Sequence, residues 1–265
     1  TNRHHIWHMR EFFSFSFVNK IIGRLASIAS EGIVCMSENI RVTLFPLYRK
    51  NNLKVIYEAL DNFAYKRYDY SASRKEFDIS DKCIVISMIS RMHPQKGQYE
   101  LLEMAQEILK EKDVLFLIAG DIAPSNLRNI LYKRKIEYFI RKMNLGYRVR
   151  LLGFRGDVDK ILSLTDICIF PFLREEPFGL AMAEAFIFGK RVLFYHRRGL
   201  DEIDAFFSHA GETLSPENLR QSIEKIRRSR FIENNITIPP VFSFNNYEKE
   251  INSFIESVTK KMNPR

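Results

Sequence analysis

Short apolar runs alternate with helix-like segments over most of the chain, and this order restricts the fold more than any other feature. The runs carry no polar residue at every second position, so each predicted strand is apolar on both faces. Such strands belong to a parallel sheet that is covered by helices on both sides. The sequence therefore predicts an α/β fold with a doubly wound, Rossmann-like parallel sheet. We predict its strands at residues 83–89, 114–119, 149–152, 167–170 and 191–195.

The segments between these strands have the spacing of helices. In residues 99–110, for example, apolar side chains recur every three or four positions. Another helix is predicted to begin at Ser215 and Pro216, because a hydroxyl cap followed by proline in the first turn favours helix initiation. We predict the remaining helices at residues 125–143, 157–164 and 179–188.

The two ends of the chain differ from this middle part. Near the start, only a helix at residues 18–30 and short strands at residues 33–37 and 54–57 are predicted, too few elements for a complete domain. Near the end, Pro239 and Pro240 precede a last helix. We expect a partial N-terminal domain at residues 1–60, a linker at 61–81, the main domain at 82–245, and a helix returning toward the N-terminal domain at 246–265.

Charge and cysteine content narrow the class of protein. A net charge of +9 over 265 residues favours an anionic partner such as a phosphate, a nucleic acid or a lipid surface. No uninterrupted apolar run reaches the ~18 residues of a membrane span, and no signal peptide is recognisable. Cys35, Cys83 and Cys168 lie far apart among apolar neighbours, which is typical of free thiols in a reducing compartment.

Glu184 is an unusual residue because it stands among alanines and phenylalanines. If a helix begins near Gly179, then Ala181, Glu184 and Phe188 share one face. A carboxylate flanked by small side chains leaves room for a ligand, and a vicinal diol can donate two hydrogen bonds to it. The alternative is a glutamate that pairs with a nearby Lys or Arg, and the segment alone does not decide between them.

Arg91 and Lys96 flank a tight turn after the first strand of the main domain, and Gly97 opens the next helix. Two cations on such a loop suit a diphosphate, although ordinary basic loops are common. Loops that follow parallel strands meet at one edge of the sheet, where ligands of such folds bind. Two cations, the free amides beside Phe178 and Gly179, and a diol-binding Glu184 in one crevice fit a nucleoside diphosphate that carries a sugar.

These segments resemble the retaining GT-B glycosyltransferases, the group described as glycosyl transferases group 1 or family 4. The resemblance extends from Lys82 to about Glu212. It includes LFLIAGD, VRLLGF, DICIFPF and above all EEPFGLAMAEAFIFGKRV, which carries the family's Glu-x7-Glu signature as Glu176 and Glu184. The spacing with PFG after the first glutamate is specific, whereas the Arg91 to Lys96 loop alone is a weak signal.

The resemblance implies roles for particular residues. Arg91 and Lys96 would bind the donor diphosphate, Glu184 would hold the ribose hydroxyls, and Glu176 would face the donor sugar. The backbone near Phe178, Gly179 and Leu180 would contact the sugar or phosphate. Phe154 and Arg155 would lie near the base. The family neutralises the phosphates with protein cations, so no cofactor or metal is expected.

The beginning of the chain resembles the later part of the family's N-terminal domain. In HHIWHMREFF, His8 matches the histidine that faces the cleft, although a structural histidine is the alternative. Glu58 and Ala59 replace the Asn-Gly that is usual at the hinge, which leaves the hinge geometry open. No segment matches the family's first strand and glycine-rich loop. Because the chain begins at Thr1, we expect it to be a fragment or a truncated copy.

The predicted function is that of a retaining glycosyltransferase of the hexosyl type. It would transfer sugar from a nucleotide donor to a glycan or lipid-linked acceptor in cell-envelope, capsule or lipopolysaccharide assembly. The expected location is the cytoplasm, free or at the inner face of the membrane. Residues 126–150 are basic with interleaved aromatic residues, so they fit either an anionic membrane or a solvated helix face. No nucleic-acid-binding motif is present. The alternatives are a truncated remnant without activity and a sugar-nucleotide epimerase.

Overall fold

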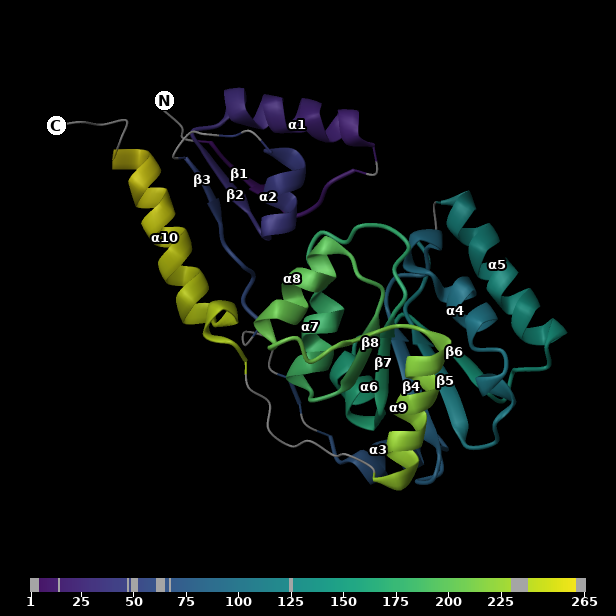
Figure 1. The fold of residues 1–265 in the computed structure, drawn as a ribbon. Coiled ribbons are helices and arrows are strands. Elements are labelled where there is room, and N and C mark those ends of the chain that lie inside the picture. Colours follow the sequence, from purple (N-terminus) through teal and green to yellow (C-terminus); the bar gives the residue numbers. More distant parts are fainter. Residues whose placement is uncertain are drawn as a thin grey trace.

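The computed structural model describes residues 5–13, 15–46, 48, 52–60, 65, 66, 68–123, 126–229 and 238–260. These residues form a small sheet of three strands and a large sheet of six strands (Figure 1). Every strand pair in both sheets is parallel. The predicted α/β class with mostly parallel sheets is therefore confirmed.

The large sheet has the strand order β6-β5-β4-β7-β8-β9. Every residue of β4, β5 and β7 is buried, as the continuous apolar runs predicted. The short strand β9 at the edge was not predicted, because two residues carry too little pattern. The strands are β4 (Ile84–Ile89), β5 (Val114–Ala119), β6 (Val149–Gly153), β7 (Ile167–Phe170), β8 (Arg191–Phe194) and β9 (Glu212–Thr213).

Helices connect these strands, and the path of the chain through them fixes the point at which the strand order reverses. The chain runs outward from β4 through β5 to β6, and α6 then brings it back to β7 on the other side of β4. The right-handed rule for such crossovers places α4 and α5 on one face and α6, α7 and α8 on the other. The helices are α4 (Gln98–Met104), α5 (Leu127–Lys142), α6 (Val158–Leu164), α7 (Leu180–Ile187), α8 (Arg198–Phe206) and α9 (Pro216–Arg228).

The predicted helix at residues 99–110 is shorter than expected. It ends with α4, and a separate 3-10 turn, η2 (Ile108–Lys110), follows. Helix α8 was not predicted, because its apolar positions are few and it follows the strand after only a short loop. Ser125, where the next predicted helix was placed to begin, lies outside the described residues. Among the described residues, no helix is both long enough and apolar enough to cross a membrane.

The small sheet consists of β1 (Ile6–Met9), β2 (Gly32–Cys35) and β3 (Leu53–Val55), in that order. On one face it packs against α1 (Ser16–Ala29) and α2 (Glu38–Leu44), with Ala26 and Ile40 in the shared core. On the other face Val34 contacts Phe254 and Val258 of α10 (Phe244–Lys260). The last helix therefore returns to the N-terminal part of the chain, and it lies beside the small sheet in Figure 1.

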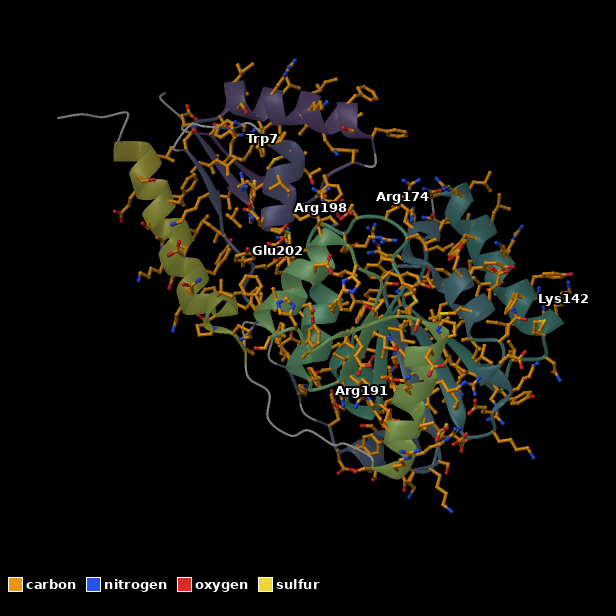
Figure 2. The ribbon with its side chains drawn as sticks, viewed as in Figure 1. Trp7, Lys142, Arg174, Arg191, Arg198 and Glu202 are labelled. Atoms are coloured by element: carbon orange, nitrogen blue, oxygen red, sulfur yellow. The ribbon has the colours of Figure 1, made fainter. Side chains whose placement is uncertain are left out.

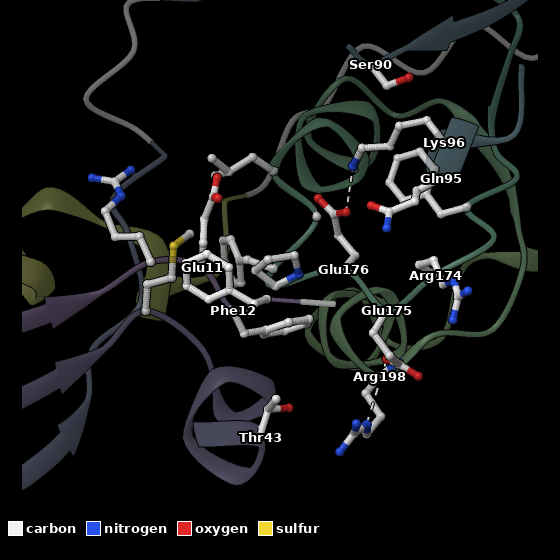
Figure 3. Close-up of a pocket in the computed structure, with 18 of the residues that line it drawn as sticks. Glu11, Phe12, Thr43, Ser90, Gln95, Lys96, Arg174, Glu175, Glu176 and Arg198 are labelled. Carbon is white, nitrogen blue, oxygen red and sulfur yellow. Dashed lines mark hydrogen bonds and ion pairs between the residues drawn. The ribbon is translucent and has the colours of Figure 1, made fainter. Parts of the chain in front are cut away.

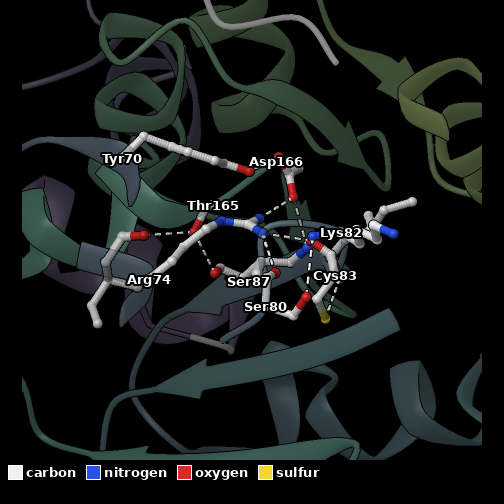
Figure 4. A network of polar contacts seen from close by, with 11 residues as sticks. Tyr70, Arg74, Ser80, Lys82, Cys83, Ser87, Thr165 and Asp166 are labelled. Carbon is white, nitrogen blue, oxygen red and sulfur yellow. Dashed lines mark hydrogen bonds and ion pairs between the residues drawn. The ribbon is translucent and has the colours of Figure 1, made fainter. Parts of the chain in front are cut away.

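Part of the segment that we predicted to be a linker forms a helix, α3 (Tyr70–Glu76). Arg74 on this helix is fully buried and forms an ion pair of 2.6 Å with Asp166, which is 4% exposed (Figure 4). Its guanidinium also donates to the carbonyl oxygens of Ser80 and Cys83, and Tyr70 Oη donates to Asp166 at 2.9 Å. Helix α3 is thus fixed to the large sheet. Residues 61–64 and 67 lie outside the described part.

The cysteines are free thiols in this structure, as the spacing predicted. Cys35 and Cys168 are buried in β2 and β7, and Cys83 is half-buried. Burial raises the pKa of the Cys35 and Cys168 thiols to about 12. These thiols stay protonated at neutral pH, so their role is packing.

Candidate functional site

A cavity of about 890 Å³ lies between the small sheet and the carboxyl ends of the strands of the large sheet. Figure 3 shows part of its lining, with Phe12 and Thr43 from the N-terminal side and Lys96 and Glu176 from the other. Much of the lining comes from the loops after β4 and β7. These two strands are neighbours, and the strand order of the sheet reverses between them. Ligands of doubly wound sheets bind at this position.

The loop after β4 brings Lys96 to the cavity. Lys96 closes the 3-10 turn η1 (Pro94–Lys96), and Gly97 follows in a left-handed conformation with φ of 79°. A Cβ atom on Gly97 would come within 2.2 Å of the carbonyl oxygen of Pro171, so this close approach between the two loops requires glycine. The loops after β4 and β7 are thereby packed directly against each other.

Lys96 lies between an aromatic ring and a carboxylate. Its Nζ atom is 3.9 Å from the centre of the Phe172 ring and 2.6 Å from Glu176 Oε2 (Figure 3). Both members of the ion pair are mostly buried, with side chains 14% and 21% exposed. A ligand phosphate at this place would have to compete with Glu176 for Lys96.

Arg91 also lines the cavity, and its side chain is exposed. Its main chain is fixed by Gln98, whose Nε2 donates to the Arg91 carbonyl at 2.8 Å and to Ser90 Oγ at 3.0 Å. Gln98 itself is fully buried. Within the described part of the chain, the Arg91 guanidinium has no ion pair or hydrogen bond, so it can reach an anion in the cavity.

The first turn of α7 faces the same cavity. Phe178, Gly179 and Leu180 all line it, and Gly179 precedes the helix with φ of 92°. In the described part of the chain, no side chain caps the amides of this first turn. Uncapped helix amides carry partial positive charge and bind anions, here beside the two cations of the β4 loop.

Glu184 lies one turn further along α7 and does not belong to the cavity lining. Its carboxylate is half-buried, and Tyr65 Oη donates to Oε1 at 3.3 Å. Burial raises the pKa of Glu184 to about 7, and the nearby Asp159 carboxylate adds to this effect, whereas the Tyr65 hydroxyl lowers the pKa. The partner that the isolated sequence left open is therefore a tyrosine, with no Lys or Arg pairing it among the described residues.

The other predicted site residues lie outside the cavity lining. His8 is an exposed residue of β1. Phe154, which is 83% exposed, follows β6 directly, and Arg155 forms two hydrogen bonds with Asp157, of 2.8 and 2.6 Å. The roles of these three residues remain predictions. His4 of the same histidine cluster lies outside the described residues.

Several charged residues of the cavity were not singled out from the sequence. Arg174 and Arg198 lie near the gap between the two sheets in Figure 2. Glu175 accepts a hydrogen bond from the Arg198 backbone amide at 3.0 Å. Arg174 stands two residues before Glu176 in the sequence, and this position could have indicated that it lies at the same cavity. Arg198 begins α8, which was not predicted.

The small sheet is fastened to the cavity loops by contacts between α2 and α8, called here the α2–α8 contact. Glu202 on α8 accepts from the backbone amides of Glu38 and Asn39 at 2.7 and 2.9 Å, and from Tyr57 Oη at 2.8 Å. The carboxylate thus caps the N-terminus of α2. Ser37 Oγ and Asn39 Nδ2 also donate to the carbonyl oxygens of Pro177 and Glu176, at 2.5 and 2.7 Å.

The hinge substitution noted in the sequence has a partner in the structure. Arg10 Nη2 donates to both carboxylate oxygens of Glu58, at 2.6 and 2.7 Å. The glutamate that stands where the resembling family has asparagine is therefore held by an arginine of the loop after β1. Among the described residues, no group of three or more His, Cys, Asp or Glu side chains is arranged to hold a metal ion.

Comparison with known proteins identifies the family of this chain. Residues 69–236, more than half of the chain, match the family described as "Glycosyl transferases group 1". The chain is 22% identical over 175 residues to the N-acetyl-alpha-D-glucosaminyl L-malate synthase of Bacillus anthracis. The aligned part covers 66% of this chain and 44% of that protein. It is 25% identical over 210 residues to the UDP-Gal:alpha-D-GlcNAc-diphosphoundecaprenol alpha-1,3-galactosyltransferase of Escherichia coli, covering 62% of this chain and 52% of that protein.

Solved structures show the same fold. The HepE protein of Anabaena in complex with UDP and glucose superimposes with a TM-score of 0.79 at 21% identity, over 96% of this chain and 72% of that one. A glycosyltransferase of Rickettsia africae gives a TM-score of 0.73 at 18% identity, over 98% and 72% of the two chains. The predicted GT-B type of fold is thus confirmed. The chain spans about half the length of the curated relatives that it matches.

Proposed function

The chain belongs to the glycosyl transferases group 1 family, and from this premise we propose that it binds a nucleotide-diphosphate sugar as the donor of a glycosyl transfer. The observation that carries the proposal is the meeting of Arg91, Lys96 and the uncapped first turn of α7 at one cavity. Two cations and free helix amides suit a diphosphate. The Anabaena structures that share the fold were solved with UDP, which supports a nucleotide of this kind.

Each residue of the site receives a proposed role. Arg91 and Lys96 bind the diphosphate, and the amides of Phe178 to Leu180 assist them. Glu184 accepts hydrogen bonds from the ribose hydroxyls, and Glu176 faces the donor sugar. When the phosphates displace Glu176 from Lys96, its carboxylate becomes available to the sugar hydroxyls. Phe154 and Arg155 lie nearer the base, and His8 nearer the transferred sugar.

The proposed reaction retains the configuration at the anomeric carbon. The bond between that carbon and the leaving phosphate oxygen breaks, and the acceptor oxygen forms its bond from the same face. The acceptor proton passes to the leaving phosphate oxygen, so atoms and charge balance without a protein base. Arg91 and Lys96 stabilise the charge that grows on the diphosphate, which is the largest contribution expected at such a site. No cofactor or metal takes part in this proposal.

We further propose a hexosyl transfer to a glycan or a lipid-linked acceptor in cell-envelope assembly, on the cytoplasmic side of the membrane. The Escherichia coli relative is described as acting on a diphosphoundecaprenol compound, which supports a lipid-linked acceptor. Helix α5 supports contact with anionic lipid, because it ends in Arg141 and Lys142 and exposes Tyr138. A vesicle co-sedimentation assay with and without anionic lipid tests this last point.

Calorimetric titration with UDP, GDP and ADP tests donor binding. We expect one of them to bind with micromolar affinity, and Arg91→Ala and Glu184→Ala to lower the affinity at least about tenfold, since each removes a charged hydrogen-bonding partner. Lys142→Ala is the matched control, because this exposed cation lies at the far end of α5, away from the cavity (Figure 2). It removes the same charge and leaves the affinity unchanged.

The result separates the donor site from its alternative. If none of the three nucleotides binds, this chain is a remnant without a working donor site, and the proposal fails. Equal losses in Arg91→Ala and Lys142→Ala would mean that the chain attracts nucleotides only by its net positive charge. Circular dichroism of each variant shows whether the fold has been kept.

A further inference from the structure

Tyr65 and Lys66 contact two neighbouring helices of the large sheet, α7 and α6. Tyr65 Oη donates to Glu184 Oε1 at 3.3 Å, and its ring stands edge-on to Phe188 with the ring centres 5.5 Å apart. The backbone amide of Lys66 donates to Asp159 Oδ2 at 3.0 Å. Tyr65 is therefore joined to α7 by its side chain, while its neighbour is joined to α6.

Helix α3, which comes shortly after Tyr65 in the sequence, is anchored firmly to the large sheet. Helix α3 is fixed by the buried Arg74–Asp166 pair, and Tyr70 Oη also binds Asp166 at 2.9 Å (Figure 4). A buried ion pair of this kind resists displacement, because separating it would leave an unpaired charge inside the protein. Nearer to Tyr65, its orientation is supported by the Lys66 amide bond to Asp159 and by the packing of its ring on Phe188.

The surroundings of Glu184 leave it short of favourable partners. From α6 it faces the Asp159 carboxylate, which repels a second negative charge, and burial removes water. Within the described residues, the hydrogen bond that its carboxylate receives comes from Tyr65. Tyr65 is also the group here that favours the ionised form of Glu184, since a hydroxyl donates more strongly to a carboxylate than to a carboxylic acid.

We propose that Tyr65 is a positioning residue for Glu184, holding the carboxylate so that its remaining lone pairs meet the diol of the donor ribose. This inference rests on the proposed function, in which Glu184 binds that diol. A carboxylate can accept several hydrogen bonds, so the tyrosine and the two ribose hydroxyls can share it. A protonated Glu184 loses part of this acceptor capacity, so donor binding depends on the charge state that Tyr65 favours.

Tyr65→Phe is the direct test, because it removes only the hydroxyl and keeps the ring that packs on Phe188. UDP-glucose is the first probe, since its two bridging phosphates do not titrate between pH 6 and 9. For the natural chain we expect affinity to rise with pH through about 7, where Glu184 ionises. In Tyr65→Phe we expect affinity at pH 7 to fall about 3–10-fold, and the midpoint of the pH profile to move upward.

Two control variants make the profile interpretable. Glu184→Gln removes the titrating group, so its affinity should be low and should not depend on pH. Tyr68→Phe deletes a hydroxyl from the same segment, where the ring lies near Lys160 rather than Glu184. It should leave both the affinity and the midpoint unchanged.

The outcomes separate this inference from the proposed function. Tighter binding by Tyr65→Phe would mean that the hydroxyl occupies the place of the ligand, and an unchanged midpoint would mean that it does not act on Glu184. Either result overturns the inference while donor binding stands. The Glu184 carboxyl titration, followed by NMR in the free protein, needs no ligand. It should move to higher pH in Tyr65→Phe, and an unmoved titration overturns the inference even if no nucleotide binds.

Discussion

The large and the small sheet are both parallel, but their strands are buried to very different extents. In the large sheet, β4, β5 and β7 are buried completely and helices cover both faces. In the small sheet only β2 is buried throughout, while every residue of β3 is half-buried. One face of the small sheet is covered by α10, which comes from the opposite end of the chain. Both sheets contribute to one main core, but most of its residues come from the large sheet and its helices, whereas one face of the small sheet is covered by a distant segment.

This difference assigns separate tasks to the two parts. The large sheet positions Arg91, Lys96 and the first turn of α7 through loops that are packed against its buried strands. The N-terminal part contributes the opposite wall of the cavity, and it is held to the Glu176 loop by Asn39, whose Nδ2 donates to the Glu176 carbonyl oxygen. We therefore expect damage to the small sheet to open the cavity without dismantling the anion site. Damage to the large sheet should remove both.

The largest effects are expected from two core substitutions, one in each part of the molecule, which test whether the two parts can be damaged separately. Phe116 of β5 is 1% exposed and Phe254 of α10 is 4% exposed, so each replacement by alanine should cost about 3–5 kcal/mol. Phe116→Ala should lower the melting temperature of the large sheet and abolish nucleotide binding. Phe254→Ala should release α10 and speed amide exchange in β2, while nucleotide binding persists. Equal loss of binding in both variants would contradict the separation.

Arg74→Met tests how strongly the segment between the two parts is held. The substitution leaves Asp166 buried without its ionic partner, and we expect a loss of about 3–5 kcal/mol in the free energy of unfolding. Arg227→Met is the control, because that residue's ion pairs with Glu111 and Asp113 lie at the surface, where such pairs contribute about 0–1 kcal/mol each. Urea unfolding of both variants measures the contrast, and similar losses would argue against it.

Glu202→Gln should weaken the α2–α8 contact by about 1–3 kcal/mol, because a neutral amide accepts less strongly from the α2 amides and Tyr57. Hydrogen exchange should accelerate at Glu38 and Asn39 and stay slow in β4 and β5. Glu217→Gln at the exposed start of α9 removes the same charge far from the contact and should change neither. Faster exchange throughout the large sheet would show that the two parts are not separable.

The smallest expected effect concerns pH. The pKa of Glu184 is raised from 4.5 to about 7 in the folded chain, so the folded state holds this proton more tightly than the unfolded state. Stability is therefore lost as pH rises between these values. Glu184→Gln should raise stability by about 1–2 kcal/mol at pH 8 and much less at pH 5. Melting temperatures at the two pH values measure this, and an equal gain at both would exclude ionisation as the cause.

The strands of the large sheet and the cavity loops could be predicted from the sequence because their signals are local. Continuous apolar runs mark buried parallel strands, and the loops that follow them must share an edge of the sheet. Arg91, Lys96 and Phe178 to Leu180 were predicted and do lie together at one cavity. Helix α3 was missed because its pattern is polar and its fixation comes from Asp166, which is distant in the sequence.

The sequence by itself determined the parallel α/β architecture, the loops that follow its strands and the family, since each depends on residues that are close together along the chain. Only the tertiary structure decided which hydrogen-bonding or ionic partner each charged side chain has. Lys96 pairs with Glu176, Glu184 accepts from Tyr65, and Glu202 caps α2, across separations of 80, 119 and about 164 residues. Such partners are fixed by the packing of whole elements, because a buried or half-buried charge pairs with whichever polar group the fold brings within hydrogen-bonding distance.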